Sequence, residues 1–226
     1  MIDDPPVLTI RRKFNRPSKQ QLDGLKKAGT GVVVDCLGGR GGVALTAINP
    51  AAARFCGVAV TCHAGPADNL AVFGALDISI AGDVIVIATD SFKSTAVIGD
   101  MVLGMAKNRG VVAMVTDGYV RDIEGLCAVD LPCYAAGVTP NSPARNGPGS
   151  AGLPIVLVET VVNSGDIIVG DRDGIVVIPF EQIDAVLAAL PQVLAAESEL
   201  EKKVKEGLQM PDFVAGLLSG GSVKEV

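Results

Sequence analysis

The stretch that decides the fold is GDMVLGMAKNRGVVAMVTDGYVRD, residues 99–122. Its first part has the pattern of a helix that begins at Asp100 and is closed by residues 108–110, Asn-Arg-Gly. Its second part, residues 111–116, is a short apolar run typical of a buried strand, and a sharp turn follows it. A helix followed by a strand brings the chain back, so the start of the helix and the end of the strand can share one edge of a sheet. Open α/β sheets usually carry their ligand sites at such an edge.

Charged residues mark both ends of this stretch. Asp100 stands at the start of the helix, and the pair Arg121-Asp122 follows after twenty intervening residues. A hard cation such as Mg²⁺ takes oxygen ligands and often only one or two protein carboxylates, so Asp122 is a candidate ligand. Arg121 offers a planar fork that matches a carboxylate, and the helix start at Gly99 offers free N–H groups. These parts could hold a 2-oxo acid whose enolate a Lewis acid would stabilise when a carbon–carbon bond breaks.

The same residues also have a purely structural interpretation. Arg121 and Asp122 can form an ordinary surface ion pair, and Asp100 can simply complement the helix dipole. In the functional interpretation, Asp100 orients a water molecule or holds one that relays a proton. The spacing alone does not decide between these two interpretations.

Composition narrows the class of protein. The 226 residues, of which 49% are apolar, suffice for one domain with a substantial core. The formal net charge of −6 argues against nucleic acid as a partner, because an acidic protein gains nothing from counterion release. No apolar run approaches membrane-spanning length, and the acidic, proline-containing start does not resemble a signal peptide. Five cysteines without CxxC spacing indicate reduced thiols, so we expect a cytoplasmic protein.

The single histidine, His63, excludes sites that need several imidazoles. His63 follows a predicted strand and could act as a base, although a loop histidine is more often simply solvated. No sequence pattern assigns a basic partner to any of the cysteines, which argues against a nucleophilic role.

The order of the other elements predicts an α/β fold with a mixed central sheet and a long C-terminal helix, rather than a regular doubly wound sheet. We expect an extended arm over 1–16, a single domain over 17–207 and a C-terminal extension over 208–226. Residues 30–34 fit a short helix or a strand, and Pro191 predicts a kink or break in the last long helix. Expected helices cover 18–27, 68–76, 100–108, 180–206 and part of 211–221; expected strands cover 56–62, 83–88, 111–116, 131–135, 155–162, 167–168 and 174–178; expected loops cover 38–42 and 140–152.

The pattern Gly-Asp, twenty residues, Arg-Asp resembles the signature of the RraA-like family, which includes the class II 4-hydroxy-4-methyl-2-oxoglutarate / 4-carboxy-4-hydroxy-2-oxoadipate aldolases. Further matches flank it in the family's order: GVAVTC at 57–62, ADN at 67–69, AGDVIVI at 81–87 and DGYVRD at 117–122. The similarity covers about residues 20 to 207. It implies a swivelling β/β/α domain.

The resemblance also implies a role for each matched residue. Arg121 would bind the pyruvyl group, and Asp122 would be the direct ligand of a divalent cation, Mg²⁺ or Mn²⁺. Family members form homotrimers or dimers of trimers with sites at subunit interfaces, where a glutamate of the neighbour's C-terminal helix helps hold water on the metal. The substrate-binding helix start would comprise Gly99, Asp100, Met101 and Val102, and the candidate glutamates are Glu197, Glu199 and Glu201.

The activity that the resemblance implies is retro-aldol cleavage of 4-hydroxy-2-oxo acids, which releases pyruvate. Oxaloacetate decarboxylation would use the same enolate step. The alternative is a non-catalytic regulator that binds a ribonuclease, as some family members do. The retained Asp100, Arg121 and Asp122 favour the enzyme, because a pure binding protein does not need them. Loops 37–46 and 138–152 depart from the family pattern and leave the substrate beyond its pyruvyl half open.

Overall fold

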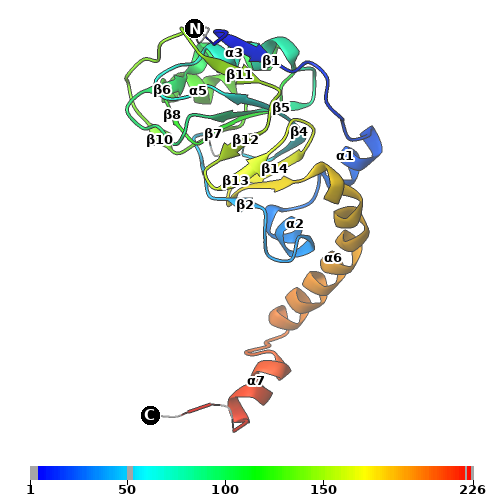
Figure 1. Cartoon of the computed structure of the whole chain (residues 1–226). Helices are drawn as coiled ribbons and strands as arrows, with labels where there is room; N and C mark the ends of the chain where they lie inside the picture. The colour runs from blue at the N-terminus through cyan, green and yellow to red at the C-terminus, as the bar shows by residue number, and fades with distance from the viewer. Residues whose placement is uncertain (1–4, 50–52, 222, 225–226) are drawn as a thin grey trace.

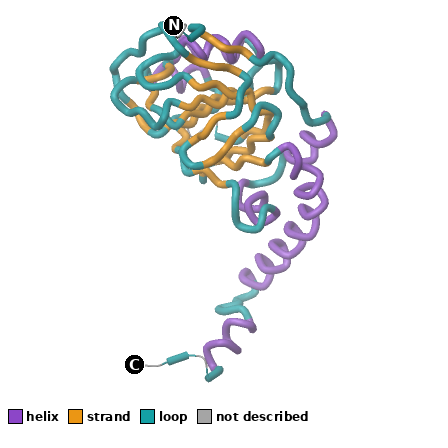
Figure 2. The backbone as a smooth tube through the Cα atoms, in the orientation of Figure 1, coloured by secondary structure: helices purple, strands orange, loops and turns teal. Residues whose placement is uncertain are grey.

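The computed structural model describes residues 5–49, 53–221 and 223–224. A strand-rich body carries a long C-terminal helix that projects away from it (Figure 1). The strands gather in the middle of this body, and the helices lie on its outside (Figure 2). The chain therefore has the α/β architecture with a mixed sheet and a long last helix that its element order predicts.

The body is built on a mixed ten-stranded sheet. Its centre consists of four parallel strands: β4 (Phe55–His63), β5 (Asp83–Ala88), β7 (Ala113–Thr116) and β9 (Cys133–Ala135). All residues of β5 are buried, as expected for an apolar run in a parallel sheet that is covered on both faces. The hairpin of β14 (Ile167–Asp171) and β15 (Gly174–Ile178) continues the sheet in antiparallel fashion beside β4.

One short segment joins the two ends of this sheet. β2 (Gly42–Val43) pairs with β15 at one end, and β3 (Thr46–Ala47) pairs with β9 at the other. Because β2 and β3 are separated by two residues in the chain, the sheet must curl back on itself. Its inner face is filled by apolar side chains, among them Phe55 and Tyr134, whose rings meet edge to face with 5.6 Å between centroids.

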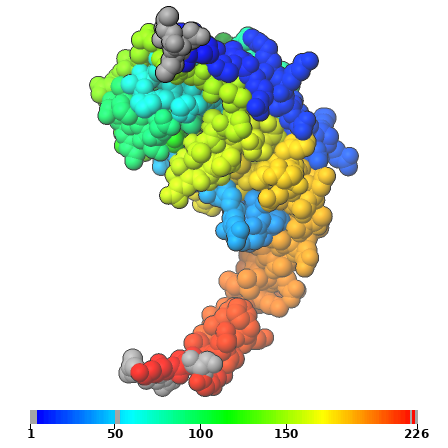
Figure 3. All heavy atoms as spheres, in the orientation of Figure 1, coloured from blue at the N-terminus to red at the C-terminus, as the bar shows by residue number. Residues whose placement is uncertain are grey.

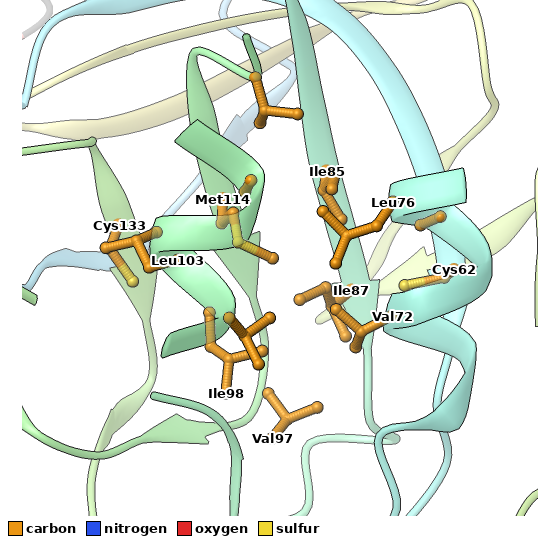
Figure 4. Close-up of a cluster of buried hydrophobic side chains, with 14 of the residues drawn as sticks. Cys62, Val72, Leu76, Ile85, Ile87, Val97, Ile98, Leu103, Met114 and Cys133 are labelled. Atoms are coloured by element: carbon orange, nitrogen blue, oxygen red, sulfur yellow. The ribbon is translucent and has the colours of Figure 1, made fainter. Parts of the chain in front are cut away.

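Helices cover the outer face of the curled sheet in two groups. α3 (Leu70–Ile78) and α4 (Asp100–Asn108) cover the central strands, where Val72 and Leu76 of α3 approach Ile85 and Ile87 of β5 (Figure 4). α1 (Lys19–Leu25), α2 (Thr30–Cys36) and the first turns of α6 (Ile183–Lys205) cover β14 and β15.

A smaller parallel sheet extends beyond the carboxyl ends of the central strands. β6 (Ala96–Ile98) follows β5, β8 (Tyr119–Val120) follows β7, and β10 (Gly137–Val138) follows β9. β8 lies in the middle and pairs in parallel with both neighbours. The three strands therefore end side by side, and the segments that leave them are brought together.

The second half of α6 and the helix α7 (Asp212–Ser219) form an arm outside the body (Figure 3). The buried residues of α6 are Ile183, Val186 and Leu190, all in its first half, and α7 has no buried residue. Within the described residues, no helix combines the length and the apolar character needed to cross a membrane.

The structure corrects the expected strands in several places. The strand expected over 155–162 is a hairpin, β12 (Ile155–Leu157) and β13 (Thr160–Val162), because the chain turns at Val158 with a φ of 57°. The loop expected over 140–152 ends in β11 (Gly149–Ala151), which pairs with β4 and with β1 (Leu8–Ile10) of the expected arm. β8 lies within the turn expected after residue 116. β8 and β11 are short strands whose pairing partners are distant in sequence, whereas β12 and β13 pair with each other.

The structure also decides the ambiguous helices. Residues 30–34 are helical, within α2, and the helix expected over 68–76 is α3, shifted by two residues. Pro191 does not break the long helix: α6 runs through it without interruption from a short 3₁₀ turn at 180–182. Pro191 is exposed to solvent, where water can satisfy the backbone carbonyl that loses its helical hydrogen bond.

Candidate active site

The residues predicted from the stretch 99–122 come together at the ends of the small sheet. Gly99 follows β6 and Arg121 follows β8, and the Arg121 backbone N–H donates to the Ile98 carbonyl at 3.1 Å. A Cβ on Gly99 would lie 2.3 Å from Asp122 Oδ2 and 3.2 Å from Arg121 Nε. Only glycine permits this approach. The start of the helix and the end of the strand thus share one edge.

Asp122 is the N-cap residue directly before helix α5 (Ile123–Val129), and its backbone is in the left-handed region, with φ 63° and ψ 52°. Residues other than glycine seldom adopt this conformation, and such strain is concentrated at functional sites. Its Oδ2 accepts a hydrogen bond from Arg121 Nε at 3.1 Å. The two side chains are 36% and 42% exposed, so their ion pair adds little stability and stays open to a ligand.

The Arg121 guanidinium is held from a second side that the sequence did not reveal. Its Nη1 donates to Ser142 Oγ, in the loop that follows β10. In the sequence, Ser142 is one polar residue in a segment rich in proline, glycine and asparagine, so no local signal distinguishes it.

Asp100 is the first residue of α4, as expected, and its side chain folds back onto the first turn of the helix. Its Oδ1 accepts from the Met101 backbone N–H at 2.7 Å, which occupies one of the N–H groups predicted for a substrate. The Val102 side chain is buried, so Val102 can offer a ligand only its backbone, whereas Met101 is 70% exposed. The Asp100 carboxylate lies against α5, because a Cβ on Gly125 would be 2.4 Å from its Oδ2.

The donors at this edge fit a hard cation held by one carboxylate. In the described part of the chain, no three His, Cys, Asp or Glu side chains gather into a metal cluster. Mg²⁺ does not need one, since it usually keeps several waters and binds through one or two carboxylates. The half-exposed Asp122 carboxylate is a donor of this kind, and Arg121 beside it can neutralise an anionic ligand.

A buried carboxylate, Asp117, shapes the loop that leads into β6. It accepts hydrogen bonds from the Thr89 N–H at 2.7 Å, the Thr89 hydroxyl at 2.8 Å and the Ser91 N–H at 3.0 Å. These bonds hold Asp90 and Ser91 in the left-handed region, with φ 57° and 55°. In the sequence, Asp117 stands out only as the first residue of the motif DGYVRD, because its hydrogen-bond partners lie in the connection between two other strands.

His63 ends β4, and its Nε2 lies 2.9 Å from Asp90 Oδ1. Asp68, which shares its loop, binds elsewhere: its carboxylate accepts from the backbone N–H groups of Leu70 and Asn146 at 2.8 and 2.6 Å. His63 therefore has an acidic partner, and within the described part of the chain no hydrogen bond connects it to Arg121 or Asp122.

The three candidate glutamates lie on the projecting part of α6. Glu199 and Glu201 form ion pairs with Lys203 and Lys205 at 2.8 and 2.5 Å, and the hydrogen bond from Lys203 lowers the pKa of Glu199. Glu197 borders a groove between α2 and α6. Within one chain these residues are remote from the small sheet, so their contribution to a neighbour's site stays a prediction.

Three of the cysteines, Cys56, Cys62 and Cys133, lie on strands of the main sheet. Burial raises the pKa of Cys133 to about 12 and that of Cys56 to about 11. Thiols with a raised pKa stay protonated at neutral pH, and a protonated thiol is a poor nucleophile.

Comparison with known proteins places this geometry in a family. The profile of the RraA-like family (Aldolase/RraA) matches residues 29–177. A Halalkalibacterium halodurans protein, whose name gives 4-hydroxy-4-methyl-2-oxoglutarate aldolase as a proposed activity, is 36% identical over 152 residues. That alignment covers 67% of this chain and 72% of the relative.

Solved structures share the fold. An uncharacterised Pseudomonas syringae protein superposes with a TM-score of 0.75 at 23% identity, covering 87% of this chain and 97% of its own. The RNA-processing inhibitor RraA of Thermus thermophilus superposes with a TM-score of 0.61 at 28% identity, covering 68% and 93%. With the family profile spanning well over half of its length, this chain belongs to the RraA-like family.

Proposed function

We propose that the protein is a divalent-metal-dependent lyase that cleaves 4-hydroxy-2-oxo acids and releases pyruvate. The observation that carries the proposal is the contact of Gly99 with Arg121 and Asp122, which sets an arginine and a carboxylate against the start of α4. The relative named for this aldolase activity supports the same class of reaction. Decarboxylation of oxaloacetate is included, because it passes through the same pyruvate enolate.

Each residue has a defined task in this reaction. Arg121 binds the substrate carboxylate through the N–H groups that Asp122 and Ser142 leave free. The remaining N–H groups in the first turn of α4 lie beside it and favour negative charge. Asp122 would hold Mg²⁺ or Mn²⁺, which supplies Lewis-acid stabilisation of the enolate when bound. Asp100, at the same helix start, holds a water molecule that carries a proton.

The atoms of the cleavage balance without a further reactant. The C3–C4 bond of the 4-hydroxy-2-oxo acid breaks, and its electron pair stays on C3 to form the enolate of pyruvate. The C4 hydroxyl loses its proton and becomes the carbonyl of the second product. C3 then takes up a proton to give pyruvate, so the site must remove one proton and return one.

The test is pyruvate release from 4-hydroxy-4-methyl-2-oxoglutarate and from oxaloacetate, with and without Mg²⁺ or Mn²⁺. We expect pyruvate release that EDTA abolishes and metal restores. The rate of pyruvate release should fall at least about a thousandfold in Asp122→Asn, because this variant removes the charge that holds the cation. Asp130→Asn is the matched control, because Asp130 is also an exposed carboxylate in left-handed conformation, at the other end of α5. Full activity of Asp122→Asn, or activity in EDTA, would exclude the metal mechanism.

Regulation of a ribonuclease is the second candidate function, supported by the likeness to the Thermus RNA-processing inhibitor. It predicts that the protein inhibits ribonuclease cleavage of an RNA substrate and that Asp122→Asn inhibits equally well. Absence of pyruvate release from both oxo acids, together with such inhibition, would reverse the order of the two proposals. The acidic charge favours contact with a protein over contact with the RNA itself.

A further inference from the structure

We propose that Ser142 is a positioning residue for Arg121, which it holds in the orientation that binds the substrate carboxylate. This inference rests on the proposed function, since it concerns the same arginine. Ser142 lies in the third of the segments that leave the small sheet. Gly99 follows β6, Arg121 follows β8, and the loop with Ser142 follows β10. The sheet therefore delivers the helix start, the arginine and the serine to one place.

The hydrogen bonds of the guanidinium define what Ser142 does. A guanidinium carries five N–H groups in a rigid plane. Among the described residues, Nε donates to Asp122 and Nη1 donates to Ser142. The two acceptors bind different nitrogens, so together they fix both the position and the rotation of the guanidinium plane. The N–H groups that remain are enough for a bidentate contact with a carboxylate.

The loop around Ser142 is built to hold one conformation. Asn141 is tied to β6 and to the segment before it: its side chain donates to the Ser94 carbonyl at 2.8 Å, and its own carbonyl accepts from the N–H of Ala96, the first residue of β6, at 2.9 Å. Ser142 precedes Pro143, which restricts its backbone to extended conformations. An exposed serine can act as a fixed acceptor only if its backbone is held in this way.

The other side of the loop is anchored as firmly. The Ala144 N–H donates to the Ala67 carbonyl at 2.7 Å, and the Ala144 carbonyl accepts from the Asn69 N–H at 3.0 Å. Asp68, nine-tenths buried, accepts from the Asn146 N–H at 2.6 Å and the Gly147 N–H at 3.2 Å. Ser142 is thus bracketed by anchored residues, and its hydroxyl is a stable partner for Arg121.

The experiment compares Ser142→Ala, Ser142→Thr and Ser142→Val in the metal-loaded protein. The readouts are the dissociation constant of oxalate, a planar analogue of the pyruvate enolate, and the kinetics of pyruvate release. Removing the hydroxyl should raise the dissociation constant of oxalate about tenfold. It should raise KM by a similar factor, while kcat changes less than about threefold. Thr keeps the hydroxyl and should stay within about threefold of the wild type, whereas Val, of nearly the same shape, should behave like Ala. A variant of the neighbouring residue, Asn141→Ser, cannot replace these three, because it removes the side-chain bond to Ser94 that holds the loop.

The outcomes separate this inference from the proposed function. If the wild type releases pyruvate and Ser142→Ala binds oxalate as tightly as the wild type, the positioning role is wrong and the lyase proposal stands. If the wild type releases no pyruvate but binds oxalate in a way that both Arg121→Met and Ser142→Ala weaken, the positioning role stands without the lyase. If the wild type neither binds oxalate nor releases pyruvate, both proposals fail. An equal loss in Thr and Val would also overturn the inference, because it would reflect shape rather than the hydroxyl.

Discussion

Gly99 carries no side chain, and the space that a Cβ would fill is occupied by the Asp122 carboxylate and the Arg121 side chain. This contact explains why a glycine precedes Asp100: the arginine and the acid can approach the helix start only if that position is bare. The same contact distinguishes the ion pair of Arg121 and Asp122 from an ordinary surface pair, because the backbone at Gly99 leaves the space that the two side chains occupy.

Gly99→Ala should therefore reduce kcat/KM about a hundredfold, because a displacement of the reacting groups by about 1 Å has an effect of that size. The protein should still fold, since Arg121 and Asp122 are partly exposed and can move. Pyruvate release and the melting temperature are measured together.

Gly104→Ala is the control for this substitution. Gly104 lies in the same helix, and a Cβ there would meet only Val129 Cγ2 at 4.0 Å. Alanine in a helix interior should raise the free energy of unfolding by about 0.5–1 kcal/mol without loss of activity. Unchanged activity in Gly99→Ala would show that the contact at Gly99 is not needed for the reaction.

Among the elements, the hairpin β12–β13 departs most from what its sequence suggests. The run IVLVETVV, residues 155–162, is rich in β-branched residues and predicts one continuous strand. The chain instead turns at Val158, and Ile155, Leu157 and Val162 enter the core inside the curled sheet. Burial of these three side chains outweighs the strain of a β-branched residue at positive φ.

Val158→Gly should raise the free energy of unfolding by about 0.5–1 kcal/mol. The left-handed conformation costs valine about 1–2 kcal/mol, and the extra freedom of glycine in the unfolded chain offsets part of the gain. Val156 is the matched position, because it is also an exposed valine of the hairpin but lies in the strand itself. Val156→Gly should be destabilising. Urea unfolding measures both, and destabilisation by both variants would contradict the strain at Val158.

At the scale of the whole molecule, the arm formed by the second half of α6 and by α7 exposes apolar side chains to solvent. Leu200 and Val204 are 48% and 56% exposed, and Phe213 of α7 is 71% exposed. Apolar side chains at such spacing on a helix normally face a partner. We propose a homotrimer or dimer of trimers, in which this arm covers a neighbouring subunit and brings Glu197, Glu199 or Glu201 to the neighbour's site.

The expected result in light scattering is a mass of three or six chains, and a reduced mass for the double variant Leu200→Glu, Val204→Glu. The body should stay folded, because α6 is anchored by Ile183, Val186 and Leu190. Pyruvate release should fall together with the mass if the neighbour completes the site.

Lys203→Gln tests whether the arm tolerates a change of charge. It removes the exposed ion pair with Glu199, which contributes little, so mass and activity should both persist. A double variant that keeps the mass of the wild type would show that the apolar side of the arm is not the contact between subunits.

The sequence by itself determined the central architecture. Apolar runs such as DVIVIA at 83–88 become buried parallel strands, and the helix from Asp100 follows its capping and periodicity, because these signals act within a few neighbouring residues. The juxtaposition of Gly99 with Arg121-Asp122 also followed from local rules, since a helix and a strand of fixed length return the chain to one edge.

Only the tertiary structure decided the rest. β8 and β11 are strands of two and three residues, and they form only because distant strands pair with them. The chain turns at Val158 because this conformation buries the side chains on either side of it in the core. Ser142 reaches Arg121, and Asp117 holds the loop at 89–91, across connections between different strands. The physical reason is the same in each case: the free energy that selects these conformations comes from groups far away in the chain, so no local pattern of residues records it.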